Sequence, residues 1–113
     1  MSYGSFVAGL CKKNLNIKGR QAEIVHMILG ISGEAGELLD AVKKHVIYEK
    51  PLDLDNIIEE LGDLEFYLEG LRQLLGITRE EAVDKNVEKL KKRYPQGYTN
   101  QAAQERADKQ PGG

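Results

Sequence analysis

Apolar residues recur every three or four positions along most of this 113-residue chain, as they do in helices that bury one face. The longest such stretch runs from about Gln21 to Val46. Pro51 interrupts the pattern after it, because proline has no amide to donate and disfavours helix just before it. The periodic apolar residues of this stretch are Ile24, Ile28, Ile31, Ala35, Leu38 and Val42. No alternating pattern predicts a strand, so the chain is predicted to be all-α.

Capping signals bound two further helices. Asp53 suits the first N-cap, and Gly76 suits the C-cap of the same helix. Its predicted apolar face consists of Ile57, Leu61, Leu64, Leu68, Leu71 and Leu75. Thr78 and Glu81 then form a capping box that opens the last long helix, and Pro95 ends it.

A short amphipathic helix is also expected within residues 2–14, which brings the predicted number of helices to four. Four helices with short connections favour a four-helix bundle. The length suits one hydrophobic core, so residues 1–100 are assigned to a single all-α domain. Residues 101–113 are assigned to a polar C-terminal tail, expected to pack on a neighbour or to fray.

The net charge of −2 argues against an obligate role on nucleic acid or on a membrane surface. It conceals an uneven distribution, since residues 34–69 carry eleven acids and three bases, a local charge of −8. Residues 72–93 carry seven bases and four acids, or +3. Solvated helix faces can produce this division, and so can a site that binds cations with one part and phosphates with the other.

Cysteine content and hydropathy give the expected location. The single cysteine, Cys11, excludes an internal disulfide and fits a small, buried or half-buried thiol better than a nucleophile. No apolar run approaches the length of a membrane-spanning helix, and no cleavable signal is visible. A cytoplasmic protein that binds no membrane is therefore expected.

Two pairs of acidic residues stand out on the two longest predicted helices. Glu34 and Glu37 are three residues apart at the border of the first apolar stripe, and Glu60 and Asp63 repeat the arrangement on the next helix. Four carboxylates in one place repel, so each is driven to bind a proton or a cation. Mg²⁺ prefers carboxylate and water oxygens, and the repeated spacing therefore favours a metal site over solvated acids.

A di-iron carboxylate centre is the competing assignment for such a bundle. It requires Glu-x-x-His motifs on two helices, whereas this chain has one, formed by Glu23 and His26. His45 has no glutamate three residues before it, which disfavours oxidative iron chemistry. His26 is expected to be a hydrogen-bonded residue near the site or the core.

Gly30, Gly33 and Gly36 give the longest helix a side without side chains, despite a cost of about 1 kcal/mol each in a helix interior. Such a strip allows either close packing of another helix or the approach of a ligand to the backbone. Both uses stay open at this point.

The last long helix supplies positive charge. Asn86, Lys89 and Arg93 follow helical spacing and share one face, where they could contact the phosphates, sugar or base of a nucleotide. A solvated basic helix end has the same appearance. The proximity of a four-carboxylate cluster makes these three residues candidate nucleotide contacts.

These motifs resemble a known family. The chain contains Glu34-Ala-Gly-Glu37 and, after 22 intervening residues, Glu60-Leu-Gly-Asp63. This pattern is similar to the ExxE…ExxD motif of the MazG-like all-α nucleoside triphosphate pyrophosphohydrolases. The segment "NVEKLKKRYPQGYT" also resembles the end of the family's short members, many of them from bacteria and phages. The likeness covers roughly residues 21–100.

The resemblance implies a MazG-type helical fold that assembles as a homodimer or homotetramer. It further implies Mg²⁺-dependent hydrolysis of a (deoxy)nucleoside triphosphate to the monophosphate and pyrophosphate by metal-activated water, with Mn²⁺ as a substitute for Mg²⁺. By matching position, Glu34, Glu37, Glu60 and Asp63 would be the catalytic metal ligands.

One position departs from the family pattern. Some members carry a further glutamate directly before the first motif glutamate, where this chain has Gly33. Glu59 or one of the ligands would then activate water. The alternative function, from a different class, is a non-catalytic helical module that binds a metal or nucleotide, or regulates a partner, without turnover.

Overall fold

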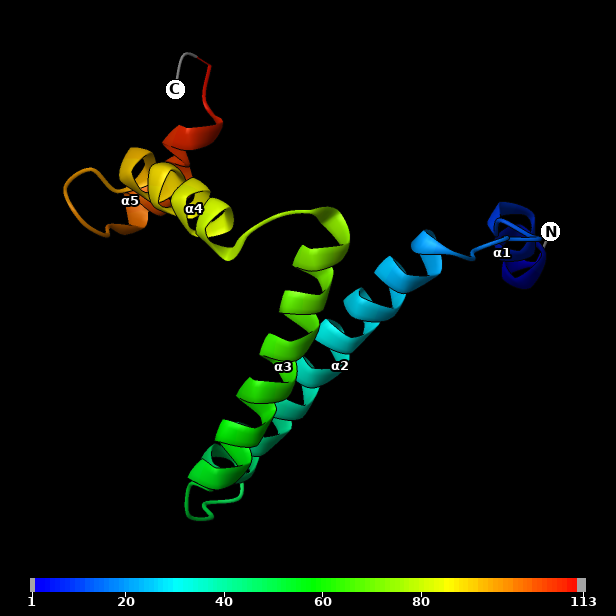
Figure 1. Ribbon diagram of the computed structural model, residues 1–113, viewed down its shortest axis with the longest axis horizontal. Coiled ribbons are helices and arrows are strands. Elements are labelled where there is room, and N and C mark those ends of the chain that lie inside the picture. Colours follow the sequence, from blue (N-terminus) through cyan, green and yellow to red (C-terminus); the bar gives the residue numbers. More distant parts are fainter. Residues whose placement is uncertain (1, 112–113) are drawn as a thin grey trace.

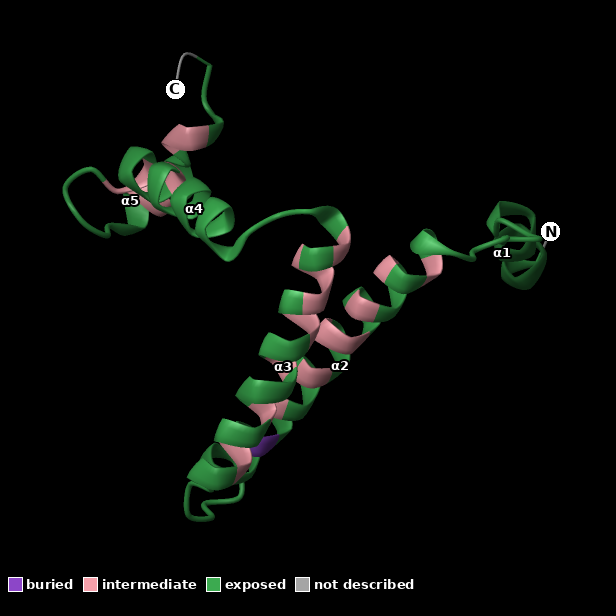
Figure 2. Cartoon of the chain, in the orientation of Figure 1, coloured by how far each residue is buried: buried purple, intermediate pink, exposed green. Residues whose placement is uncertain are grey.

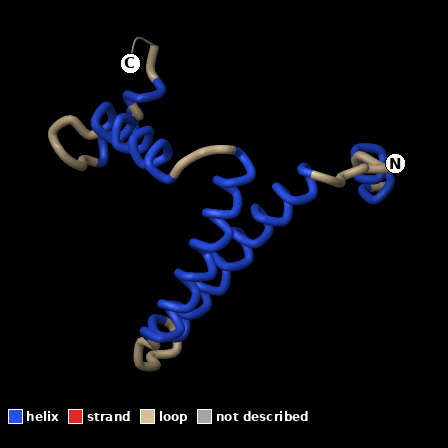
Figure 3. Tube along the Cα trace, viewed as in Figure 1, coloured by secondary structure: helices blue, strands red, loops and turns tan. Residues whose placement is uncertain are grey.

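The computed structural model describes residues 2–111, and within them the regular structure is helical apart from one isolated bridge between Pro95 and Gly97 (Figures 1 and 3). The elements are α1 (Tyr3–Leu10), α2 (Arg20–Val46), α3 (Leu54–Leu75), α4 (Arg79–Arg93), α5 (Asn100–Glu105) and a 3₁₀ turn, η1 (Ala107–Lys109). The predicted all-α class is confirmed. None of the described helices combines the length and apolar character needed to cross a membrane.

The predicted capping residues hold the helix ends. The Asp53 side chain accepts a hydrogen bond from the Asn56 amide at 3.1 Å and begins α3. Gly76 ends α3 in the left-handed conformation, at φ 69°, which glycine adopts without strain. Thr78 and Glu81 form the capping box of α4 with both reciprocal hydrogen bonds.

Helices α2 and α3 form an antiparallel hairpin whose contact face, called the seam here, advances by three and four residues alternately. The seam consists of Ile24, Met27, Ile31, Glu34, Leu38 and Ala41 on α2, and Ile57, Glu60, Leu64, Tyr67, Leu71 and Leu74 on α3. Ala41 is buried and the other eleven are half-buried. At the far end of the hairpin, the Arg20 guanidinium donates a hydrogen bond to the Leu74 carbonyl.

The seam corrects the predicted phase of the α2 core. Three residues of the predicted stripe, Ile28, Ala35 and Val42, are exposed. Met27 and Ala41 lie against α3 instead. The sequence pattern could not separate the two stripes, because α2 carries apolar residues on two adjacent faces.

Glycines allow the two helices to approach closely at two points. A Cβ added to Gly30 would lie 2.3 Å from the Tyr67 ring, and one added to Gly70 would lie 2.6 Å from the Met27 sulfur. Either distance is far inside van der Waals contact, so these two positions require glycine for packing.

The C-terminal segment, predicted to be a polar tail, contains α5 and η1, and η1 packs against α4. The Arg93 guanidinium donates to both carboxylate oxygens of Asp108, at 3.0 and 3.4 Å, and the Asp108 side chain is only 5% exposed. Half-buried alanines at 102, 103 and 107 add apolar contact. The Arg93–Asp108 ion pair and these contacts therefore hold against α4 a segment that was expected to pack on a neighbour or to fray.

One chain on its own leaves most of its apolar surface open. Its radius of gyration is 19.8 Å, against about 13 Å for a compact domain of this size. Helix α1 packs along no other described helix, and α4 lies with α5 and η1 away from the hairpin (Figures 1 and 2). The predicted four-helix bundle is not closed within a single chain.

The unpartnered surface has a definite place on the hairpin. Each of its residues directly follows a seam position, and in an antiparallel pair such positions from both helices lie on one side. This apolar side consists of Val25, Ile28, Leu39, Val42, Ile58, Leu61 and Leu75, all exposed.

Candidate metal centre

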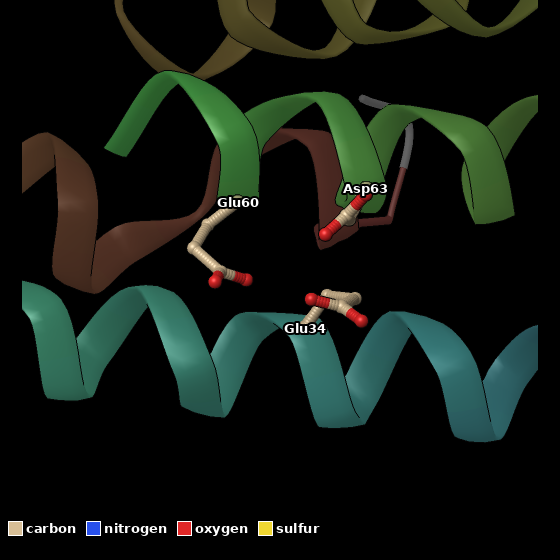
Figure 4. A group of neighbouring side chains, drawn as sticks. All are labelled: Glu34, Glu60 and Asp63. Carbon is tan, nitrogen blue, oxygen red and sulfur yellow. The ribbon is translucent and has the colours of Figure 1, made fainter. Parts of the chain in front are cut away.

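Three of the four predicted acidic residues meet near the middle of the hairpin. Glu34 comes from α2, and Glu60 and Asp63 come from α3 (Figure 4). Each contributes one carboxylate oxygen to a group in which all such atoms lie within 4.8 Å of one another. The three side chains point into the same gap between the two helices.

The seam itself brings these acids together. Glu34 follows Ile31 by three residues and precedes Leu38 by four, so its side chain is directed at α3 as theirs are. Glu60 lies between Ile57 and Leu64 in the same way. Apolar neighbours on both sides therefore fix two carboxylates in positions that normally hold apolar residues.

Glu60 carries the strongest sign of an unmet interaction. Its Oε2 atom is buried and has no hydrogen-bond partner. The pKa of Glu60 is raised above its ordinary value, first because its protonated form can share a hydrogen bond with the Glu34 carboxyl, then by burial, and then by the negative charges of Glu34 and Asp63. A buried oxygen that lacks a donor favours either a proton or a cation.

The chemistry of this donor set fits a hard divalent cation. No lysine, arginine or histidine of residues 2–111 forms an ion pair with any of the three acids. The cluster offers only carboxylate oxygens, which are the ligands that Mg²⁺ and Mn²⁺ prefer. A cation here would satisfy Glu60 and remove the repulsion among the three charges.

Glu37, the fourth predicted ligand, lies outside this group. It is exposed, and it directly precedes the seam residue Leu38. Asp63 and Glu59 precede seam positions in the same way, so Glu37 lies on the same side of the hairpin as they do. This side, called the carboxylate side, is opposite the apolar side.

The structure separates the two uses foreseen for the glycines of α2. Gly30 packs against Tyr67, whereas a Cβ added to Gly33 or Gly36 would meet nothing within 4 Å. Gly33 lies on the carboxylate side, directly before Glu34. Bare backbone there gives room for a ligand beside the carboxylates.

The candidate nucleotide contacts on α4 are not brought to the carboxylates within one chain. Arg93 is held by Asp108, and Lys89 lines a cleft of about 310 Å³ with Lys85, Glu88, Lys92, Asp108 and Lys109. Asn86 is exposed. Of the three, Arg93 therefore has a structural partner, and Lys89 belongs to a surface rich in lysine.

Phe66, an aromatic residue next to the carboxylates, was not singled out from the sequence. The Tyr67 ring lies edge-to-face with both His26, at 6.1 Å between centroids, and Phe66, at 5.2 Å. The signal was present in the spacing, since Phe66 follows Asp63 by three residues and so lies on the same helix face.

Comparison with known proteins gives one match. A family model described as the MazG nucleotide pyrophosphohydrolase domain matches residues 23–98, about two thirds of the chain. No curated protein and no solved structure matches the chain significantly. The resemblance drawn from the four-acid motif is thereby confirmed.

Proposed function

The chain belongs to the MazG nucleotide pyrophosphohydrolase family, and on this premise we propose that it converts a nucleoside or deoxynucleoside triphosphate to the monophosphate and pyrophosphate in a Mg²⁺-dependent reaction. The observation that carries the proposal is the cluster of Glu34, Glu60 and Asp63, with one buried Glu60 oxygen that lacks a partner. A solvated surface acid would have no such oxygen.

The carboxylates of Glu34, Glu60 and Asp63 would hold Mg²⁺, or Mn²⁺ in its place. Glu37, one helical turn beyond Glu34 on α2, is proposed as a fourth ligand that joins them when a substrate binds. When bound, the cation would join the acidic site to the phosphate oxygens and lower the pKa of a neighbouring water. Without it, the cluster would repel a triphosphate.

The chain's own residues would position the phosphate chain and accept a proton. Hydrolysis adds one water across the bond between the α- and β-phosphates, so that a new P–O bond forms, pyrophosphate leaves and a proton is released. Glu59, exposed on the carboxylate side, and the motif carboxylates are the candidate acceptors. Bare backbone at Gly33 leaves space for the phosphates beside them.

The proposal includes assembly as a homodimer or homotetramer. The apolar side of the hairpin exposes large residues on both helices, for example Leu39 at 69% and Ile58 at 65%. Burying this side against a second hairpin would supply the core that one chain lacks and would complete a four-helix bundle. The carboxylate side, being opposite, would stay open, and Asn86 and Lys89 could then reach it from another subunit.

The test is the release of pyrophosphate from a panel of ordinary and modified nucleoside triphosphates, with and without Mg²⁺. We expect metal-dependent release from at least one nucleotide. Glu60→Gln should abolish it with the helical content unchanged, whereas Glu49→Gln, in the exposed loop after α2, should leave it intact.

The alternative is a non-catalytic module that binds a metal or nucleotide, or regulates a partner. It would be supported if Mg²⁺ bound to the wild type and no nucleotide of the panel released pyrophosphate. Activity retained in Glu60→Gln would contradict the assigned site itself.

A further inference from the structure

Three aromatic rings form a continuous group on the hairpin. His26 and Phe66 each contact the half-buried Tyr67 edge-to-face, one from α2 and the other from the same helix. Phe66 is 66% exposed, so most of its surface is available to a ligand. A contiguous exposed apolar group beside polar residues is typical of a ligand-binding or interaction surface.

This group lies directly beside the carboxylates. Phe66 is one helical turn beyond Asp63 on α3, and Gly70 is two turns beyond, about 5 and 10 Å along the helix axis. His26 and Phe66 each precede a seam position, as Asp63 does, so they belong to the carboxylate side. Along this side, a ligand that extends from the acids would meet Phe66 and then Gly70, where the Met27 side chain packs.

A surface hollow begins at this point. It has a volume of about 640 Å³ and is lined by Met27, Phe66, Gly70, Gln73 and Arg79, together with Glu65, Glu69 and Arg72. That volume is within the range of small-molecule sites. Its floor is formed by the Met27 side chain, whose sulfur packs against the backbone of Gly70.

The acids in the hollow do not make it repulsive to a nucleotide. The Arg72 guanidinium pairs with both Glu65 and Glu69. The pKa of Glu69 is held below its ordinary value by hydrogen bonds from Gln73 and Arg72. Arg79, at the start of α4, adds a positive charge to the same hollow.

We infer that the nucleobase of the substrate stacks on Phe66 at the mouth of this hollow, with its phosphate chain extending toward Glu34, Glu60 and Asp63. The inference rests on the proposed function, because it takes the carboxylate cluster as the phosphate end of the site. A π-face stacks on any base, so Phe66 selects nucleotides over inorganic polyphosphates without choosing one base. The edge contacts with Tyr67 fix the plane of the Phe66 ring.

The competing occupant of Phe66 is a second copy of the chain. The apolar side that a second hairpin would cover follows the seam positions, whereas Phe66 precedes one and lies on the opposite side. Burial of Phe66 between subunits would therefore require an interface other than the apolar side. The observations favour the nucleobase.

A substitution series at Phe66 tests the inference. Phe66→Ala should raise KM for a hydrolysed nucleoside triphosphate roughly five- to a hundredfold, which is the loss expected for one base–aromatic stack. Inhibition by inorganic tripolyphosphate, which has no base, should stay unchanged. Phe66→Trp should restore the nucleotide KM, whereas Phe66→Leu, apolar but without a π-face, should not.

Because the chain has no tryptophan, the fluorescence of an introduced tryptophan can report base stacking directly. Phe66→Trp introduces one fluorophore, and a nucleoside triphosphate with a non-hydrolysable α,β-bridge should quench it, whereas tripolyphosphate should not. Phe6→Trp, on the separate α1 and also exposed, is the matched control and should show no quenching.

The possible results distinguish a failure of the stacking inference from a failure of the proposed function. An active enzyme in which Phe66→Ala leaves the nucleotide KM unchanged would overturn the inference and leave the proposed function intact. If Phe66→Ala had an altered sedimentation coefficient, and tripolyphosphate inhibition were weakened as much as nucleotide binding, Phe66 would belong to a subunit interface. That result would also overturn the inference. A wild type that releases no pyrophosphate would instead contradict the proposed function, and nucleotide quenching of Phe66→Trp would still support the stacking site.

Discussion

Glu34 and Glu60 come from opposite sides of one helix–helix seam, in positions that would otherwise hold apolar residues, and no basic residue of the described chain pairs with either. Apolar residues before and after each glutamate keep the two carboxylates close. The energetic cost of that arrangement, visible in the buried and unpartnered Glu60 oxygen, is what a bound cation would offset.

The stability of the metal-free protein should fall as the pH rises through the titration of Glu60. Because the pKa of Glu60 is raised above 4.5 in the folded chain, the fold binds its proton more tightly than the unfolded chain does. The free energy of unfolding therefore decreases with rising pH from 4.5 to the raised pKa, and the loss is complete above it. Glu60→Gln should lack this loss.

Thermal unfolding in the presence of a chelator, from about pH 4 to pH 8, measures the effect. The melting temperature of Glu60→Gln relative to the wild type should increase across this range. A difference that stays constant with pH would contradict the assigned titration, and Glu49→Gln serves as the control.

Mg²⁺ should stabilise the wild type and should stabilise variants of the cluster much less. A ligand present at a hundred times its Kd raises the free energy of unfolding by about 2.7 kcal/mol. We expect a rise in melting temperature that a chelator reverses, and its loss in Asp63→Asn. Glu37→Gln should keep part of the rise, because Glu37 lies outside the three-carboxylate group. Equal shifts in all variants would place the cation elsewhere.

Gly30 and Gly33 should respond in opposite ways to alanine. At Gly30 the new Cβ would collide with the Tyr67 ring, and overpacking of this kind costs about 1–3 kcal/mol. At Gly33 the space is open, so the helical preference of alanine should stabilise the chain by up to about 1 kcal/mol. Chemical denaturation of the two variants measures both effects, and destabilisation by Gly33→Ala would contradict the open position.

The Arg93–Asp108 pair should control the order of the C-terminal segment. Asp108→Asn removes the negative charge and leaves one side-chain oxygen in place of the two that accept from Arg93, so the ion pair is lost. Hydrogen exchange at residues 100–109 should accelerate while exchange in α2 and α3 stays unchanged. Unchanged protection at residues 100–109 would show that the alanine contacts alone hold the segment.

The same pair predicts a response to acid. The pKa of Asp108 is lowered from its usual 3.8, chiefly by the hydrogen bonds from Arg93. Its stabilising contribution is therefore present above pH 3.8 and is lost as the pH falls through the lowered value. Protection of residues 100–109 against hydrogen exchange should therefore persist above pH 3.8 and fall only when the pH drops below it.

The apolar side should determine the assembly. Ile58→Glu would place a charge within the proposed contact between hairpins and should reduce the molecular mass measured by sedimentation toward that of one chain. Gln101→Glu, exposed on α5, is the control. An unchanged mass in Ile58→Glu would place the interface on another surface.

The secondary structure was largely predictable because its signals are local. Capping residues such as Asp53, Thr78 and Gly76 act within a few positions of themselves, and the structure uses each as predicted. The phase of the α2 core was predicted wrongly, since Met27 and Ile28 begin two adjacent apolar stripes of similar quality. Only contact with α3 chooses between them.

The sequence by itself determined the all-α class, the helix ends and the pairing of acids at equal spacing on two helices, because these follow from helical periodicity and local hydrogen bonding. The tertiary structure decided which acids meet. Antiparallel pairing of α2 and α3 places Glu34 against Glu60 and Asp63, leaves Glu37 exposed, and binds Arg93 to Asp108. Those outcomes depend on distances between residues far apart in the chain, which periodicity along a single helix does not contain.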